Sequence, residues 1–500
     1  MFKTKFLSIL LLFFWSHILT VNCNENQPNV IIVGAGASGI AAASKLFQNG
    51  FKNVKILEAE NRIGGRVFTT KFDDYSVDLG GQWIHGEEGN VAFELAWPLG
   101  IVERGGLLST LNYLIIDSSG NLINRTLSDD LIGLFFKLKD QLSEYSEKNN
   151  GSIGEFFVTE LNKHFKDHPE LSDKSEGILH LFNMMEMGND AADTWWDVST
   201  TSISEYQDSP GDYMVNWKDR GYGTILDILM KRFPNPEEEL PVLNNTILNA
   251  EVTSIDYSNP NEKVTVKTAN GDAYTADHVI FTCSLGVLKD KHNSLFQPPL
   301  SEEKQKTIKG LGYGSEAKIL LSFENPVWNN DTSYGGFNIL WKKEDIEELE
   351  KDPERKWLLG IVGFFFIEHK PRLLFAWISG NYSREMEKLS EQQVFNQTVD
   401  ILHRFVGKHR QVPTPTGMIR TMWNSNKNFQ GTYSFRSLES DTENAWSLTL
   451  SEPIDTTKPV VLFAGEATNP KHFSTVHGAI ETGHREADRI IKMHPNLAKN

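Results

Sequence analysis

The patterned part of the chain opens with two short apolar runs separated by a helix-forming stretch. Residues 30–33 (Val-Ile-Ile-Val) form a continuous β-branched run, which predicts a strand buried on both faces of a parallel sheet. Residues 40–47 favour a helix, and the apolar run at 54–57 predicts the next strand. This strand–helix–strand order is typical of an α/β fold built on a parallel sheet.

The middle of the chain has a different pattern. Apolar residues recur at helical spacing between 131 and 145, after two aspartates suited to a helix start. They are Leu131, Leu134, Phe135, Leu138, Leu142 and Tyr145. The β-rich runs at 317–323 and 373–378 predict strands of a mixed sheet. We therefore expect a second, α+β domain that contains a core-facing helix and this mixed sheet.

Composition narrows the class of protein. The chain has 500 residues, of which 39% are hydrophobic and 23% charged, and this length indicates two or three interleaved domains. The formal net charge of −17 argues against a nucleic-acid partner, which needs a basic face on the protein, and it would help to attract a cationic substrate. Only Cys23 and Cys283 exist, so we expect no disulfide framework and no metal site.

The first 23 residues combine two lysines, a short apolar run and small residues near Cys23. This pattern predicts a signal peptide at 1–23, because the apolar run falls short of the ~20 residues that a membrane span needs. Asn-X-Ser/Thr triplets begin at Asn124, Asn150, Asn244, Asn330, Asn381 and Asn396. The last residues do not form a Ser-Lys-Leu peroxisomal address. We therefore expect a secreted or lumenal glycoprotein with no membrane span after signal cleavage.

Glycines between the first strand and the helix predict a nucleotide site. Gly34 permits a tight turn, Gly36 lets the backbone approach a pyrophosphate, and Gly39 allows the helix to pack closely on the strand. The helix start offers unpaired amides to the phosphates. Glu58, at the end of the second strand, is placed to accept hydrogen bonds from ribose hydroxyls. An acid at this position favours NAD or FAD over NADP, but it does not distinguish NAD from FAD.

The segment that follows Glu58 distinguishes FAD from NAD. Residues 58–66 (Glu-Ala-Glu-Asn-Arg-Ile-Gly-Gly-Arg) match a motif of the flavin amine oxidase family, and the chain resembles that family from about 28 to 491. Residues 460–468 and 474–479 resemble the family's last strand and the helix start after it. The resemblance implies a two-dinucleotide-binding, Rossmann-like FAD domain that is discontinuous in sequence. We expect it at 27–107, 216–305 and 429–500, with the substrate domain at 108–215 and 306–428.

The resemblance also implies which residues hold FAD. They are Gly34, Gly36, Ser38, Gly39, Glu58, Ala59, Arg66, Gly81, Gln82, Trp83, Val252, Trp423, Glu466, Thr475 and Val476. In the family, Val252 would contact adenine, Glu466 the ribityl chain, and the amides of Thr475 and Val476 the flavin pyrimidine, where they stabilise negative charge. No cysteine lies near 431–432, where some relatives attach the flavin, so non-covalent FAD is expected.

Three residues are candidates for catalysis. Lys318 lies in an apolar strand, where it is either an edge lysine that reaches solvent or, as in the family, the lysine that holds a water against flavin N5; burial would lower its pKa. His85 follows Trp-Ile, as in animal spermine and N1-acetylpolyamine oxidases, and is either a ligand of the secondary amine or a structural histidine. Tyr433 would form one aromatic wall beside the flavin, with Thr475 opposite.

Acidic residues would recognise the rest of a polycation. Glu186 falls where spermine oxidases carry a substrate-facing glutamate, and Glu87, Glu88 and Asp190 are weaker candidates. The resemblance implies hydride transfer from the carbon beside a secondary amine of a polyamine, hydrolysis of the imine, and reduction of O2 to H2O2. A secreted L-amino-acid oxidase and a secreted FAD-binding protein without turnover remain the alternatives.

Overall fold

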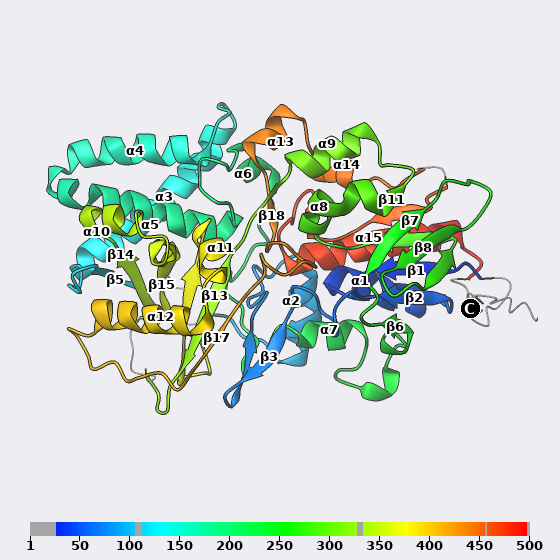
Figure 1. The fold of residues 1–500 in the computed structure, drawn as a ribbon, viewed down its shortest axis with the longest axis horizontal. Coiled ribbons are helices and arrows are strands. Elements are labelled where there is room, and N and C mark those ends of the chain that lie inside the picture. Colours follow the sequence, from blue (N-terminus) through cyan, green and yellow to red (C-terminus); the bar gives the residue numbers. More distant parts are fainter. Residues whose placement is uncertain (1–26, 106–112, 328–333, 456–457, 498–500) are drawn as a thin grey trace, which may run out of the picture.

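The structure is a computed structural model that describes residues 27–105, 113–327, 334–455 and 458–497. The predicted signal peptide at 1–23 and the triplet at Asn330 lie outside the described residues. The elements form two regions that lie side by side in Figure 1, one around a parallel sheet and the other around a mixed sheet.

The first region is built on a five-stranded parallel sheet with the order β19-β10-β1-β2-β6. Its strands are β1 (Val30–Val33), β2 (Val54–Leu57), β6 (Thr246–Ile247), β10 (His278–Phe281) and β19 (Val461–Phe463). The strands predicted at 30–33 and 54–57 are confirmed, and so is the discontinuous parallel sheet. Strands from the start, middle and end of the chain therefore meet in one layer.

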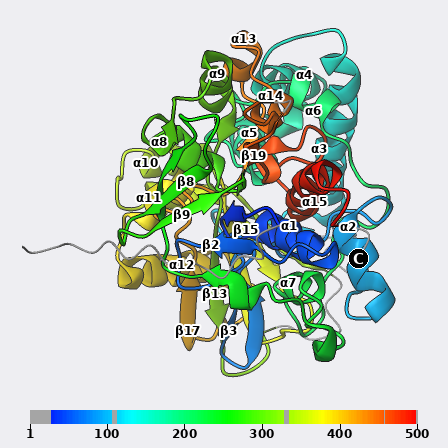
Figure 2. The same cartoon turned by 90° about the vertical axis from the view of Figure 1, so that its right-hand side faces the viewer.

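Alternate residues of β1 face two different cores. Val30 and Ile32 belong to the cluster that contains α1 (Ala37–Gln48) and α15 (Val476–Met493). These helices lie beside each other in both views (Figures 1 and 2). A Cβ added at Gly483 would lie 2.2 Å from the Ser38 carbonyl oxygen, so the helices approach closely because position 483 has no side chain.

The opposite face of the parallel sheet is covered by a four-stranded sheet with the order β11-β7-β8-β9. Its strands are β7 (Val252–Asp256), β8 (Val264–Thr268), β9 (Ala273–Ala276) and β11 (Phe296–Gln297). Ile31 and Val33 of β1 share this core with Ile255 and Val266. Helices α8 (Leu285–Leu295) and α9 (Glu302–Gly310) follow in the chain.

The second region is built on a six-stranded mixed sheet with the order β17-β13-β16-β15-β14-β5. Its strands are β5 (Tyr113–Asp117), β13 (Ala317–Ser322), β14 (Gly336–Leu340), β15 (Ile361–Phe366), β16 (Leu373–Ile378) and β17 (Gly417–Arg420). Neighbours are antiparallel except β14 and β5, which are parallel. The predicted mixed sheet is confirmed.

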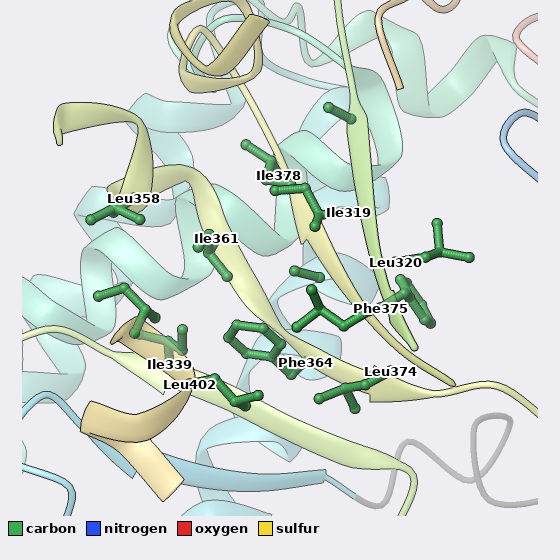
Figure 3. Packing of buried hydrophobic residues seen from close by; sticks show 14 of the residues in the cluster. Ile319, Leu320, Ile339, Leu358, Ile361, Phe364, Leu374, Phe375, Ile378 and Leu402 are labelled. Atoms are coloured by element: carbon green, nitrogen blue, oxygen red, sulfur yellow. The ribbon is translucent and has the colours of Figure 1, made fainter. Parts of the chain in front are cut away.

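Helices cover both faces of this sheet. On one face, α12 (Glu391–Val406) contributes Leu402 to the cluster of Ile339 and Phe364 (Figure 3). On the other lie α3 (Arg125–Ser146), α4 (Ile153–Asp167) and α5 (Ser175–Asp190). The predicted helix at 131–145 is α3, and its apolar stripe is buried at Leu131, Phe135, Leu138 and Leu142 because that face packs on α4 and α5.

The remaining short helices and strands are distributed over both regions. They are β3 (Thr69–Phe72), β4 (Tyr75–Asp78), α2 (Val91–Ala96), α6 (Thr201–Glu205), α7 (Thr224–Leu229), β12 (Gly312–Tyr313), α10 (Lys343–Leu349), α11 (Tyr382–Glu387), β18 (Ser434–Phe435), α13 (Leu438–Thr442) and α14 (Ser447–Ser451). The domain bounds given above stay a proposal. Within the described ranges, we find no helix with the length and hydropathy to cross a membrane.

Candidate active site

A single cavity of 1190 Å³ runs between the two regions. It extends from Glu58 at the parallel sheet and Val252 of the four-stranded sheet, past Trp83 and Lys318, to Glu186 on α5. The other predicted site residues in its wall are Gly34, Gly36, Ser38, Ala59, Arg66, Gly81, Gln82, His85, Trp423, Tyr433, Glu466, Thr475 and Val476. Gly39 is absent from that wall. The fold thus gathers residues from five separated stretches of sequence around one space.

The glycine loop has room for a ligand at one position and none at the others. A Cβ at Gly39 would lie 2.0 Å from the Gly34 carbonyl oxygen, so Gly39 serves the contact between helix and strand. At Gly36 the nearest atom to such a Cβ is the Gly64 carbonyl oxygen at 3.9 Å. Gly36 is also the N-cap of α1 and has no side chain to cap it. The first amides of α1 therefore face an open cradle that suits a pyrophosphate.

Glu58 lies at the end of β2, as predicted. Its two carboxylate oxygens accept hydrogen bonds from the amides of Ala35 (2.7 Å) and Glu60 (2.8 Å). Burial raises the pKa of Glu58, and these amides oppose the rise. Cys283 lines the same end of the cavity, where burial raises the pKa of its thiol to about 12. The thiol is therefore not nucleophilic at neutral pH.

Arg66 and Glu466 tie three loops together in the cavity wall. Arg66 Nη1 donates to the Thr432 carbonyl oxygen (2.5 Å) and to Glu466 Oε1 (2.9 Å). Glu466 Oε2 accepts hydrogen bonds from Ser434 Oγ (2.6 Å) and the Ser474 amide (2.9 Å). The carboxylate is therefore held from several sides, which positions the backbone that leads into α15.

The start of α15 also faces the cavity. Thr475 is its N-cap, and Thr475 Oγ1 accepts a hydrogen bond of 3.0 Å from the Gly478 amide. The amide of Val476, the first residue of the helix, is not bonded within the helix, as at any helix start. A second helix N-terminus thus meets the cavity beside Gly81, where developing negative charge would be stabilised.

Lys318 points from β13 into the cavity rather than to solvent. Its Nζ donates to the Gly80 carbonyl oxygen and to Gln82 Oε1, both at 2.8 Å. Burial lowers its pKa to about 8, and the charge of Asp78 opposes this shift. The rings of Trp83 and Trp377 lie 5.7 and 5.3 Å from Nζ. Lys318 is thus held in place and is close to its protonation equilibrium at neutral to mildly alkaline pH.

His85 is oriented by a backbone contact. Its Nδ1 lies 2.7 Å from the Tyr213 carbonyl oxygen, so Nδ1 must donate and Nε2 is left as an acceptor in the neutral ring. The His85 ring also packs on the Tyr213 ring, with centroids 4.4 Å apart. Burial lowers the pKa of His85, which keeps the ring neutral at physiological pH.

Tyr433 lines the same cavity as His85. Its hydroxyl donates to the Gly188 carbonyl oxygen at 2.9 Å, and burial raises its pKa. Trp423 Nε1 donates to the Leu79 carbonyl oxygen at 3.0 Å. Both aromatic rings are therefore fixed by hydrogen bonds to backbone, and they form rigid parts of the wall.

The sequence interpretation missed several residues in the wall. Among them are Lys139, Tyr213, Glu316 and Trp377. Only Lys139 carried a signal: it lies four residues after Phe135 and three before Leu142, which places a lysine on the buried face of a predicted helix. Lys139 Nζ lies 2.9 Å from Glu186 Oε1, and the Glu186 side chain is 0% exposed.

Comparison with known proteins identifies the family. The model of a family described as flavin containing amine oxidoreductase matches residues 37–491. The chain belongs to this family. A relative from Bos taurus, named peroxisomal N(1)-acetyl-spermine/spermidine oxidase, is 30% identical and covers 93% of this chain and 95% of its own. The relative of the same name from Homo sapiens is 29% identical, with the same coverage.

A solved structure of a putrescine oxidase double mutant with redesigned cofactor binding has the same fold. Its TM-score is 0.67 and its sequence identity 18%, over 93% of this chain and 99% of the other. This flavin-containing amine oxidoreductase is therefore an enzyme with FAD as its cofactor, as predicted. The open cradle at Gly36, the acid at Glu58 and the second helix start at Val476 fit such a cofactor.

The predicted secreted location is wrong for this flavin-containing amine oxidoreductase. Both relatives are named as peroxisomal, which contradicts secretion. The prediction depended on a short apolar run and on Asn-X-Ser/Thr triplets, and such short patterns arise by chance in chains that are not exported. The predicted glycosylation depended on secretion and is not carried further.

Proposed function

We propose that this enzyme is an FAD-dependent polyamine oxidase. Spermine or an N1-acetylated polyamine is oxidised at the carbon beside a secondary amine, and the imine is hydrolysed to an aldehyde and a shorter polyamine. When bound, FAD supplies the acceptor for the hydride and passes the electrons to O2, which gives H2O2. The names of the relatives from Bos taurus and Homo sapiens support this substrate class.

The distribution of charge along the cavity carries the proposal. Near Trp83 the candidate partner of the amine is the neutral His85. Towards α5, the wall contains the carboxyl groups of Asp140, Glu186, Asp190 and Glu316 against one ammonium, that of Lys139, and burial raises the pKa of Glu316 well above its usual value. A long molecule with a neutral amine in its middle and a positive charge towards one end is complementary to this arrangement.

Each catalytic residue has a role that its contacts allow. His85 Nε2 accepts a hydrogen bond from the secondary amine, which must be neutral because its lone pair assists loss of the hydride. Lys318, fixed by Gly80 and Gln82, would hold a water beside the flavin ring once FAD is bound. Tyr433 forms one wall of the substrate channel, and the small side chain of Thr475 leaves the opposite wall open.

We also propose that FAD is held without a covalent bond, in a domain formed by 27–107, 216–305 and 429–500, with the substrate domain at 108–215 and 306–428. Cys283, the free thiol of the described residues, has Glu58 and Glu251 as electrostatic neighbours. These belong to the ribose end of the cavity, so the thiol is remote from the place proposed for the flavin ring. The proposed cofactor contacts are those given from the sequence, with Gly39 acting through the packing of the loop.

Anaerobic mixing tests the proposal. The holoenzyme is mixed separately with spermine, N1-acetylspermine, spermidine and L-leucine, and the absorbance of oxidised flavin is followed before air is readmitted and peroxide is measured. We expect a polyamine to bleach the flavin and to yield peroxide. Bleaching by L-leucine alone would identify an amino-acid oxidase, and no bleaching by any of the four would indicate a binding protein without turnover.

A further inference from the structure

The wall of the cavity at α5 contains an ion pair made by the protein itself. Lys139 on α3 places its Nζ 2.9 Å from Glu186 Oε1 on α5. The Lys139 side chain is 27% exposed and lines the cavity, whereas that of Glu186 is 0% exposed. The ammonium of Lys139 therefore forms the surface that a substrate meets, and the carboxylate of Glu186 lies behind it.

Lys139 is positively charged in this setting. Burial disfavours its ammonium, but Glu186 and Asp190 together raise the pKa of Lys139 above its ordinary value. Glu186 Oε2 has no hydrogen-bond partner within the described part of the chain. A buried carboxylate is costly without a counter-ion, so Glu186 depends on Lys139 and is not free to bind a second cation.

Asp190 is the carboxylate on α5 that remains available. It lies one helical turn after Glu186 on α5 and lines the same wall. It accepts no hydrogen bond from the residues that the structure describes. Burial raises its pKa to about 7; Glu186 adds to this rise and Lys139 opposes it, and Tyr213, Tyr433 and Glu316 face the same space. With Asp190 ionised, the three charged groups carry one net negative charge.

We propose that Lys139 is a specificity-determining residue: it neutralises Glu186, so that Asp190 rather than Glu186 receives one positive charge at the far end of the substrate. This inference rests on the proposed polyamine oxidase function. Lys139 thus sets how many substrate charges are matched at this end. Without it, two carboxylates would face the substrate and would favour a more highly charged molecule.

A purely structural ion pair between α3 and α5 predicts something different. Loss of such a pair would loosen the helices and weaken the binding of all substrates alike. Loss of a residue that selects charge changes the affinity for a ligand with a charged end relative to the affinity for a ligand with an uncharged end. The ratio is therefore the decisive measurement.

The test compares two pairs of ligands on the holoenzyme. The first pair is spermine and N1-acetylspermine, compared by KM. The second is an α,ω-diaminoalkane and the alkylmonoamine of the same length, whose Kd is measured from the change in flavin absorbance without turnover. The second pair keeps this test separate from the proposed function, because binding is measured even if no polyamine is oxidised.

Two single variants should act in opposite directions. Asp190→Asn should weaken binding of the more highly charged member of each pair by about tenfold relative to its partner, as expected for the loss of one charge contact. Lys139→Met should strengthen binding of that member by about tenfold relative to its partner, because Glu186 becomes available. Weaker relative binding of the charged member in Lys139→Met, or an unchanged ratio in Asp190→Asn, would overturn the proposal.

Two further variants protect the test against misfolding. Lys139→Arg keeps the charge and should keep the ratio of the parent enzyme. The double variant Lys139→Met with Glu186→Gln removes both members of the pair and leaves Asp190, so its ratio should return to that of the parent. A double variant that keeps the ratio of Lys139→Met would also overturn the proposal.

Discussion

Arg66 donates a hydrogen bond of 2.9 Å to Glu466, a residue 400 positions later in the chain. The contact joins the segment after β2 to the segment after β19, and both segments line the cavity proposed for FAD. The cradle is therefore closed by a bond between the two ends of the chain rather than by one local motif.

Glu466→Gln tests this closure. The variant leaves the Arg66 guanidinium without its carboxylate, and breaking a buried pair of this kind costs about 3 kcal/mol. We expect a lower melting temperature and a lower flavin content in the purified protein. The exposed pair Arg125–Asp129 is the matched control, and Asp129→Asn should leave both quantities unchanged.

Gly36→Ala and Gly39→Ala separate binding from folding. The methyl group at position 36 would meet no atom closer than the Gly64 carbonyl oxygen at 3.9 Å, so the apoprotein should keep its melting temperature while FAD binds about tenfold more weakly. The methyl group at position 39 meets the Gly34 carbonyl oxygen, so the apoprotein itself should melt at a lower temperature. Equal loss of stability in both variants would contradict the open cradle.

Lys318→Met should change how stability depends on pH. The pKa of Lys318 is lowered from 10.5 to about 8, so between these values the unfolded chain binds more protons than the folded chain. The free energy of unfolding of the parent therefore rises with pH across this window, by about 3 kcal/mol for this group. The cost of burying the Lys318 ammonium is fully present below pH 8. The difference in unfolding free energy between parent and variant, measured with denaturant from pH 7 to 11, should show this rise. A Met variant of the exposed Lys52 should not.

Two replacements of His85 distinguish its ring nitrogens. The variant His85→Asn keeps a donor close to the place of Nδ1, and with it the contact to the Tyr213 carbonyl oxygen, but it has no group at the place of Nε2. The longer side chain of His85→Gln reaches the place of Nε2. We expect the rate of anaerobic flavin reduction to fall about a hundredfold in His85→Asn and less in His85→Gln. A larger loss in His85→Gln would show that the contact with Tyr213 matters more than Nε2.

The nucleotide end of the site could be predicted because its signals are local. Gly34, Gly36, Gly39 and Glu58 lie within one strand–helix–strand unit, and the physical need for each is visible in neighbouring residues. The buried stripe of α3 was predictable for the same reason. Most of the other residues predicted to line the cavity were predicted from the family resemblance rather than from their spacing in the sequence.

The substrate end was less predictable because its contacts join distant positions. Lys139 and Glu186 are 47 residues apart on different helices, and no periodicity in either helix indicates that they meet. The orientation of His85 depends on a backbone oxygen 128 residues away, which leaves no trace in side-chain pattern. Such pairs are set by tertiary packing, and the sequence alone did not place them.

The close packing of α1 against α15 has a consequence for biosynthesis. Gly36 is translated long before Glu466, Thr475 and Val476, although all four residues line the same cavity. Until then, one side of the cavity is missing and Arg66 has no carboxylate partner. A nascent chain that has not yet reached Glu466 therefore lacks one side of the cavity proposed for FAD.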